Sequence, residues 1–297
     1  MKDPRNDTNM KTSHLISVSA LQDALAQHPT KVLVCDCRYD LVDATLGQHA
    51  YEAGHIPGAI YLNLGKVLSG RSDGTNGRHP LPDPDRLALD LAELGVNHDT
   101  LIVAYDSPGA SYAARLWWCA RWVGHQNVVV LDGTIDAWTQ AGLPLSTETT
   151  PAKTTGNFKR GVSLTKTVDY ADVRKGLGRS DRLIIDGRPG DRFEGLNETL
   201  DPKAGHIPGS LSRFSKNNLD ASFRFKSPEV LKAEFSSLMG ARAPEQVVAS
   251  CGSGVAACHL LLAMELAGLQ GAALYGGSWS EWCAQPDAPV ETGKASI

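Results

Sequence analysis

The chain carries the same sequence pattern twice, and this duplication constrains its fold more than any other feature. The motif Gly-His-Ile-Pro-Gly occurs at residues 54–58 and again at residues 205–209. Three further pairs of segments match in the same order along the chain: 32–38 with 183–188, 101–106 with 246–251, and 133–138 with 277–282. Chance similarity does not produce four matched landmarks in one order, so we expect two structural copies of one domain.

Each copy alternates short β-rich apolar runs with helical stretches, such as residues 110–123 in the first copy and 256–267 in the second. This alternation is typical of an α/β fold in which a mainly parallel sheet is flanked by helices. A length of 297 residues is sufficient for two such domains, each with its own hydrophobic core. The sequence therefore predicts two tandem α/β domains.

The domain boundaries follow from changes in composition. Residues 1–13 are polar and mixed in charge, without the apolar core of a secretory signal, and we expect a disordered lead there. The segment 146–155 is rich in Thr, Pro and Lys and lacks helical or strand periodicity. We accordingly place the first domain at residues 14–145, a linker at 146–163 and the second domain at 164–297.

The composition argues against several classes of partner. Hydrophobic residues make up 42% and charged residues 21% of the chain, which is typical of a soluble globular protein. A net charge of −4 gives no indication of nucleic-acid or anionic-membrane binding. No apolar run reaches the roughly 18–20 residues that span a bilayer. The six cysteines lack the dense spacing of a disulfide framework, so we expect reduced thiols and a cytoplasmic location.

Cys251 is the candidate nucleophile. It follows the apolar run 246–250 and opens a loop of small residues that leads into the apolar stretch 260–269. A buried strand, a glycine-rich turn and a helix start direct backbone N–H groups and the positive end of the helix dipole toward one point. A thiol held there ionises more easily than free cysteine. The alternative is a buried core cysteine before an ordinary turn. We expect the anion cradle to comprise Gly252, Ser253, Gly254, Val255 and Ala256.

Asp106 occupies the place in the first copy that Cys251 occupies in the second. Active sites in parallel α/β folds gather at the carboxyl ends of strands, where both residues are expected. Because an aspartate cannot serve as a thiol nucleophile, we expect the first domain to be catalytically silent and to form one wall of the cleft.

The twin Gly-His-Ile-Pro-Gly motifs, the loop 251–256 and the motif Gly-Ser-Trp-Ser-Glu-Trp at 277–282 together resemble the tandem-domain rhodaneses, which are 3-mercaptopyruvate and thiosulfate sulfurtransferases. The resemblance covers nearly the whole chain from about residue 14. It implies that the Cys251 thiolate takes a sulfane sulfur from a small-molecule donor, 3-mercaptopyruvate or thiosulfate, and becomes a persulfide. It also implies that a thiol, cyanide or a thioredoxin-like protein accepts the sulfur, without a metal or an organic cofactor.

The residues after Cys251 bear on the choice of donor. Thiosulfate enzymes of the family tend to place basic residues there, whereas mercaptopyruvate enzymes carry Cys-Gly-Ser-Gly-Val-Thr. This loop has no Arg or Lys and resembles the second pattern, with Ala256 in place of Thr. Mercaptopyruvate enzymes often carry a further Arg before the second His-Ile-Pro-Gly motif, where residues 197–203 hold only Lys203 as a cation. The resemblance thus favours 3-mercaptopyruvate and leaves thiosulfate as the alternative.

Three more residues are candidates for donor binding. Arg192 matches the family's substrate arginine, and a guanidinium can hold a carboxylate or sulfonate through two parallel hydrogen bonds. Arg188 is a second candidate, but Arg38 repeats it in the first domain, which favours an internal ion pair. His79 resembles the family's histidine that pairs with the loop serine. Ser253 is then either a catalytic residue that passes a proton or a small turn residue.

Other interpretations of the motifs are less well supported. His55 and His206 occur in both copies, which favours a structural role. Cys35-Asp36-Cys37 lies in an apolar run and lacks the ligands that would complete a metal site. A phosphatase or arsenate reductase needs Cys-x5-Arg, and Ala257 stands where that arginine would be. A non-enzymatic sulfur carrier or persulfide sensor is a further alternative, against which Arg192 counts.

Overall fold

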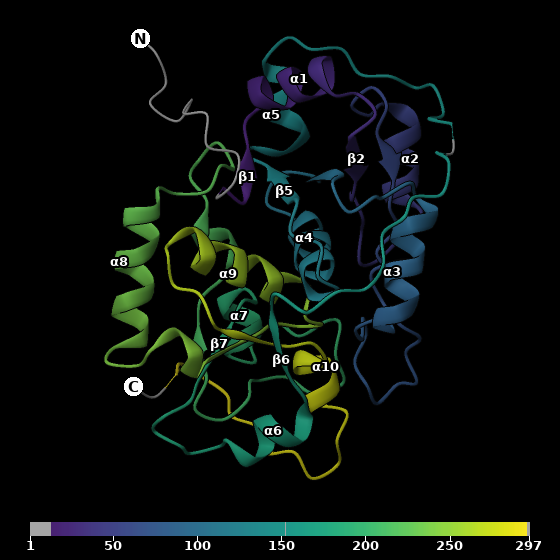
Figure 1. The fold of residues 1–297 in the computed structure, drawn as a ribbon. Coiled ribbons are helices and arrows are strands. Elements are labelled where there is room, and N and C mark those ends of the chain that lie inside the picture. Colours follow the sequence, from purple (N-terminus) through teal and green to yellow (C-terminus); the bar gives the residue numbers. More distant parts are fainter. Residues whose placement is uncertain (1–12, 152, 296–297) are drawn as a thin grey trace.

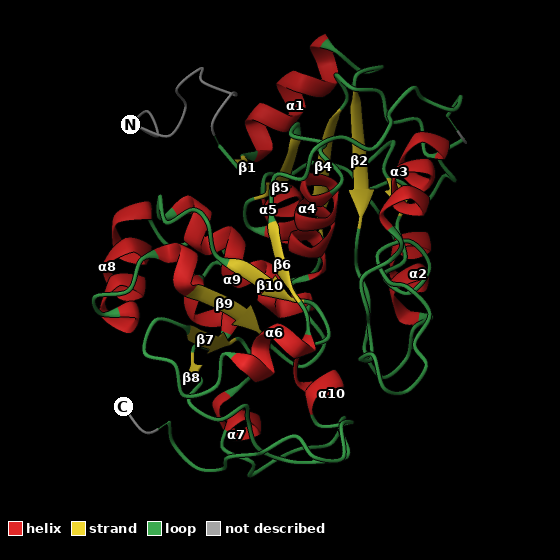
Figure 2. Cartoon of the chain, turned by 60° about the horizontal axis from the view of Figure 1, so that its bottom comes forward, coloured by secondary structure: helices red, strands yellow, loops and turns green. Residues whose placement is uncertain are grey.

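The computed structural model describes residues 13–151 and 153–295, and these fold into two α/β domains (Figures 1 and 2). The expectation for residues 1–13 falls almost wholly outside the described residues. The strands are β1 (Leu15–Ile16), β2 (Val32–Asp36), β3 (Ile60–Tyr61), β4 (Leu101–Tyr105), β5 (Val128–Leu131), β6 (Lys166–Val168), β7 (Leu183–Asp186), β8 (Leu211–Ser212), β9 (Val247–Ser250) and β10 (Ala273–Tyr275). The helices are α1 (Val18–Gln27), α2 (Leu46–Ala53), α3 (Pro84–Glu93), α4 (Tyr112–Trp122), α5 (Thr134–Gln140), α6 (Tyr170–Lys175), α7 (Gly190–Phe193), α8 (Pro228–Met239), α9 (Val255–Leu266) and α10 (Ser278–Trp282).

The two sheets have the same topology. Over the described residues the first is ordered β1-β5-β4-β2-β3 and the second β6-β10-β9-β7-β8, and every strand pair is parallel. The central strand is β4 in one sheet and β9 in the other, and these strands lead into Asp106 and Cys251. The predicted pair of α/β domains with flanked parallel sheets is therefore confirmed.

The strands are short apolar runs because both faces of each sheet are covered by helices (Figure 2). In β2, Leu33 and Cys35 face one hydrophobic core, whereas Val32 and Val34 face another. This alternation is the two-residue period of an extended chain. The runs that looked like strands in the sequence are thus the buried centres of the two sheets.

The domains meet mainly through α4 and α9 (Figure 1). Trp117 and Trp118 of α4 share one hydrophobic core with Leu261 and Met264 of α9. Since α4 follows Asp106 and α9 follows Cys251, their packing brings the N-terminal loops of both helices to the boundary between the domains. No helix in the described part of the chain is both long enough and apolar enough to cross a membrane.

The repeated histidines have equivalent surroundings. His55 Nδ1 lies 2.8 Å from the carbonyl oxygen of Tyr51, and its ring stacks on the Tyr51 ring. His206 Nδ1 lies 2.8 Å from the carbonyl oxygen of Phe193, and its ring stacks on the Phe193 ring. The same contacts in both domains agree with a structural role for this motif.

Candidate functional site

Cys251 directly follows β9 and begins the loop that enters α9, which we call the Cys251 loop (residues 251–256). Its side chain is buried, and the residue is 2% exposed. Gly254 adopts a left-handed conformation with φ of 78°, which a residue without Cβ adopts at low cost. Within the described chain, the amides of residues 252–256 donate to no backbone acceptor. These amides are free to stabilise an anion at the start of α9.

Residues of the motif 277–282 form hydrogen bonds with the backbone of the Cys251 loop. The Cys251 amide donates to Ser278 Oγ over 3.1 Å, and that hydroxyl donates to the Tyr275 carbonyl. The amides of Trp279 and Ser280 donate to the carbonyl oxygens of Cys251 and Gly252 over 3.0 and 2.8 Å. Three of these hydrogen bonds hold the backbone of Cys251 and Gly252 directly, and the fourth fixes the Ser278 hydroxyl that accepts from the Cys251 amide.

His79 reaches this loop from the other domain. It belongs to the covering loop (residues 62–83), which runs from β3 of the first domain to α3. His79 Nδ1 lies 3.0 Å from Ser253 Oγ, so the structure brings these two predicted site residues together. Burial, with the charges of Arg78 and Arg115 adding to it, lowers the pKa of His79 to about 4. The imidazole is therefore neutral near pH 7.

The covering loop is anchored by Arg115, a fully buried residue of α4. Its guanidinium donates to the carbonyl oxygens of Leu68 and His79, each within 3.2 Å. It also donates to the carbonyl oxygen of Gly254 over 3.3 Å. One side chain thus connects the covering loop to the Cys251 loop across the domain boundary.

Arg192, in α7, lies beside the Cys251 loop and is held by two acids. Its guanidinium donates to both carboxylate oxygens of Glu198, over 2.7 and 2.9 Å, and to Asp201 over 3.0 Å. A Cβ built on Gly252 would lie 3.5 Å from Arg192 Nη1. The side chain is therefore oriented by carboxylates on one edge and approaches the loop with the other.

Arg78 was missed by the sequence analysis. It forms an ion pair with Asp201, the same carboxylate that Arg192 contacts. A Cβ built on Gly252 would lie 3.1 Å from Arg78 Nη2. The signal was available, because Arg78 directly precedes His79 and the chain lacks the second arginine expected at 197–203.

Arg188 has contacts of a different kind. It is 2% exposed, pairs with both oxygens of Asp186, and donates to the carbonyl of Gly205 over 2.8 Å. Arg38 makes the matching contacts with Asp36 and Gly54 in the first domain. Burial acts to lower the pKa of Arg188, but Asp186, Glu198 and Cys251 together raise it. We assign Arg188 to an internal clamp beside the site.

Lys203 is also committed elsewhere. Its ammonium donates to the carbonyl oxygen of Gln285 over 3.0 Å. Its own carbonyl oxygen accepts a hydrogen bond from the Trp279 indole. Lys203 therefore fastens the end of the second domain and does not stand in for the absent arginine.

The equivalent place in the first domain is closed. The Asp106 carboxylate accepts a hydrogen bond from the Ala113 amide over 2.9 Å, and burial raises its pKa to about 7. The cavity beside it has a volume of only about 20 Å³. Apolar side chains from the second domain line it, among them Leu219, Phe223 and Phe225. This place therefore holds an acid under a mainly apolar cover, with Arg224 beside Gly133 and Lys216 beside Gly109.

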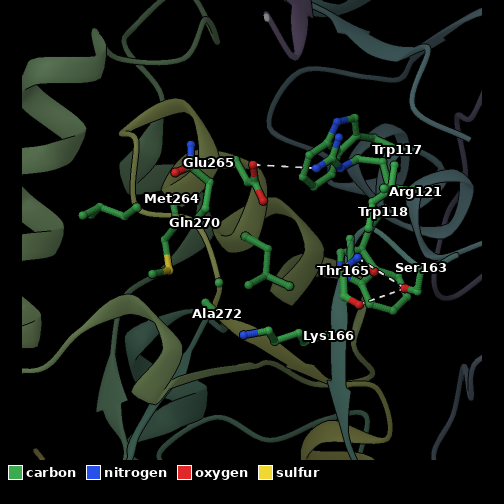
Figure 3. A pocket seen from close by; sticks show the side chains of 14 residues that line it. Trp117, Trp118, Arg121, Ser163, Thr165, Lys166, Met264, Glu265, Gln270 and Ala272 are labelled. Atoms are coloured by element: carbon green, nitrogen blue, oxygen red, sulfur yellow. Dashed lines mark hydrogen bonds and ion pairs between the residues drawn. The ribbon is translucent and has the colours of Figure 1, made fainter. Parts of the chain in front are cut away.

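One cavity in the described residues lies away from Cys251. It has a volume of about 390 Å³ and is lined by the C-terminal halves of α4 and α9 and the start of β6 (Figure 3). Arg121 and Glu265 face each other across it, 3.8 Å apart. None of the residues that line this cavity belongs to the Cys251 loop.

Cys35 and Cys37, considered above as half of a metal site, are buried free thiols. Burial raises the pKa of Cys35 to about 12, so it is protonated near pH 7. Ala257, at the place of a phosphatase arginine, is fully buried in α9. Neither place has the chemistry that its alternative requires.

Comparisons with known proteins agree with this geometry. The family model described as "Rhodanese-like domain" matches residues 17–141 and 169–285, one match in each domain. The chain is 40% identical over 286 residues to a Pseudomonas aeruginosa protein named "Probable 3-mercaptopyruvate sulfurtransferase", covering 96% of this chain and 100% of that one. It is 34% identical over 235 residues to the thiosulfate sulfurtransferase of Gallus gallus, covering 78% of this chain and 79% of that one. The crystal structure of SseA from Escherichia coli, described as a 3-mercaptopyruvate sulfotransferase, superposes with a TM-score of 0.77 at 28% identity. That match covers 90% of this chain and 99% of SseA.

Proposed function

The chain belongs to the rhodanese family, and from this premise we propose that it is a sulfurtransferase that moves sulfur from 3-mercaptopyruvate through a Cys251 persulfide to an acceptor. The class of enzyme follows from relatives that are named sulfurtransferases and match most of the chain. The arrangement around Cys251 supports the choice of nucleophile, because its buried thiol directly precedes the loop amides that donate to no backbone acceptor, whereas the Cys258 thiol in α9 donates to the Gly254 carbonyl.

In the first step, the Cys251 thiolate attacks the sulfur atom of 3-mercaptopyruvate. An S–S bond forms, the C–S bond breaks, and its electron pair goes to carbon 3 of the donor as pyruvate enolate. The proton of the donor thiol moves through Ser253 and His79 to carbon 3, so the products are pyruvate and a Cys251 persulfide anion. The 3.0 Å contact between His79 Nδ1 and Ser253 Oγ supports this relay.

In the second step, the acceptor attacks the outer sulfur of the persulfide, and the Cys251 thiolate leaves. Cyanide becomes thiocyanate, a thiol becomes a persulfide, and a thioredoxin-like dithiol becomes a disulfide with release of hydrogen sulfide. The amides of the Cys251 loop stabilise sulfur as an anion before and after the transfer. Removing one such donor from a comparable anion site costs roughly 3–4 kcal/mol of transition-state stabilisation.

Mass spectrometry after incubation with 3-mercaptopyruvate tests the nucleophile. We expect the protein to gain the mass of one sulfur atom at Cys251, and Cys251→Ser to abolish both this adduct and pyruvate release. Cys35→Ala, a change at a buried thiol of the first domain, is the matched control and should keep both. An adduct that survives in Cys251→Ser contradicts the proposal.

Thiosulfate is the second candidate donor, and the Gallus gallus relative named for it is the reason to test it. With thiosulfate the same attack on the outer sulfur releases sulfite. We expect kcat/KM to be higher for 3-mercaptopyruvate, because the Cys251 loop itself carries no cation. A clear preference for thiosulfate would overturn the donor assignment and keep the sulfurtransferase.

A reducing compartment suits this chemistry, and we place the protein in the cytoplasm. All six cysteines are free, and a persulfide intermediate needs Cys251 as a thiol. A non-enzymatic carrier is the remaining alternative. Such a protein would accept sulfur only from a partner and would release no pyruvate from 3-mercaptopyruvate.

A further inference from the structure

We propose that Arg78, from the first domain, is the second donor-binding residue, and that it holds the anionic end of the donor above Gly252 together with Arg192. The inference rests on the proposed function of Cys251 and adds a specificity-determining residue to it. Each domain then contributes one arginine to a single anion site.

The position of Arg78 is fixed by contacts across the domain boundary. Its amide donates to Ser280 Oγ in α10 over 2.9 Å. The preceding residue, Gly77, has φ of 96°, and a Cβ built there would lie 2.9 Å from the carbonyl oxygen of Gly277. The backbone of the covering loop thus lies directly against the start of α10, and only glycine allows this approach.

Two acids orient both guanidinium groups. Asp201 contacts Nη1 of Arg78 and Nη2 of Arg192, and the Leu200 carbonyl accepts a further hydrogen bond from Arg78 Nη1. The Glu198 carboxylate accepts hydrogen bonds from Nε and Nη2 of Arg192. Among the described residues, Arg78 Nη2 and Arg192 Nη1 make no hydrogen bond. Each arginine is therefore anchored on one edge and open on the other.

The open edges point toward the same place. Arg78 Nη2 and Arg192 Nη1 are the atoms nearest to a Cβ built on Gly252, at 3.1 and 3.5 Å. Because Gly252 has no Cβ, this space stays free beside the residue that follows the nucleophile. A donor carboxylate beside Gly252 would accept hydrogen bonds from both arginines. The rest of the donor would then extend toward the thiol of Cys251, the preceding residue.

The three arginines near Gly252 are matched by three carboxylates, so the open guanidinium nitrogens, and not an excess of positive charge, would bind an anion. Arg78 forms an ion pair with Asp201, and Arg192 forms ion pairs with Glu198 and Asp201. Arg188 forms an ion pair with Asp186. Burial acts to raise the pKa of Glu198, but hydrogen bonds from Arg192 and nearby amides lower it; burial raises the pKa of Asp201. Since each acid already shares its hydrogen bonds with arginines, an incoming carboxylate uses only the open nitrogens. The ligand class is a small 2-oxo acid carboxylate or the oxygen-bearing end of thiosulfate.

Steady-state kinetics of three variants test the assignment. We expect Arg78→Gln to raise KM for 3-mercaptopyruvate by roughly 10- to 100-fold, the range for losing a hydrogen bond to a charged group. Arg78→Lys keeps the positive charge but has one nitrogen where the guanidinium presents several, and it should give a smaller increase in KM. Arg71→Gln removes an exposed arginine from the same covering loop and should leave KM unchanged.

Alkylation of Cys251 gives a readout that does not depend on sulfur transfer. Iodoacetate is an anion and iodoacetamide is neutral, so the ratio of their rates reports the cations above Gly252. We expect this ratio to fall several-fold in Arg78→Gln, to fall less in Arg78→Lys, and to stay constant in Arg71→Gln. Thermal unfolding shows whether Arg78→Gln has kept its fold. If it has not, Arg78→Lys decides: an unchanged KM together with an unchanged alkylation ratio in that variant overturns the inference.

The two proposals fail in different ways. Wild-type protein that forms no Cys251 persulfide contradicts the proposed function, whatever Arg78 does. Wild-type protein that forms the persulfide, with Arg78→Gln folded and unchanged in both KM and alkylation ratio, contradicts only the role of Arg78.

Discussion

His79 Nδ1 and Ser253 Oγ lie 3.0 Å apart, although 174 residues of chain separate them. The histidine comes from the domain without the thiol, and the serine comes from the Cys251 loop. The first domain therefore contributes to the site of the second and does more than cover it.

This contact predicts the effect of His79→Asn. We expect kcat to fall by about 100-fold, a typical contribution of one general acid–base group, with little change in KM for 3-mercaptopyruvate. His49→Asn, a change at an exposed histidine of α2, is the control. A variant that loses affinity and keeps kcat would show that His79 only positions the donor.

The buried histidines predict how stability depends on pH. Burial, as the largest cause, lowers the pKa of both His79 and His259 to about 4. Between pH 4 and their ordinary value of about 6.5, the unfolded chain binds protons that the folded protein does not. The free energy of unfolding should therefore fall as pH decreases through this range. Urea unfolding at pH 7.5, 6, 5 and 4.5 measures it, and His79→Asn should reduce the slope.

Asp106 has the opposite dependence. Burial raises its pKa from 3.8 to about 7, so the folded protein retains a proton that the unfolded chain releases, and stability falls as pH rises through this range. Asp106→Asn removes this penalty and should raise the free energy of unfolding at pH 8 by roughly 2–4 kcal/mol, since each pKa unit corresponds to about 1.4 kcal/mol. Denaturation at pH 8 and pH 5 measures the difference. Sulfur transfer should be unchanged, because Asp106 lies in the closed loop of the first domain.

Arg115 predicts a combined loss of stability and activity. Replacing it with Met leaves the carbonyl oxygens of Leu68, His79 and Gly254 without this donor. We expect a loss of at least about 2 kcal/mol in the free energy of unfolding, from hydrogen bonds to a charged group. We also expect a lower kcat, because His79 loses its anchor. Arg86→Met, at an exposed arginine of α3, should change stability by no more than about 0.5 kcal/mol.

Arg192 predicts a separation of binding from reactivity. Arg192→Ala should raise KM for 3-mercaptopyruvate by roughly 10- to 100-fold through loss of charge-assisted hydrogen bonds. Alkylation of Cys251 by neutral iodoacetamide should remain possible, because the amides of the Cys251 loop do not involve this side chain. If KM for the donor stays constant, Arg192 is not the anion anchor.

Local patterns in the sequence were sufficient for the architecture. Four matched segments established two domains, and the apolar run before Cys251, the turn and the helix start indicated a thiol at the edge of a sheet. Gly254 has the left-handed conformation that such a turn needs. These features depend on residues close together in the chain, and they could therefore be predicted.

Contacts between the domains could not be predicted in the same way. His79 reaches Ser253, and Arg78 reaches the space above Gly252, only because α4 packs against α9 and brings the covering loop across the boundary. No local pattern encodes that packing, since it depends on the shapes of two complete hydrophobic faces. The sequence by itself therefore determined the fold and indicated Cys251 as the candidate nucleophile, whereas only the tertiary structure decided which arginines lie beside Gly252.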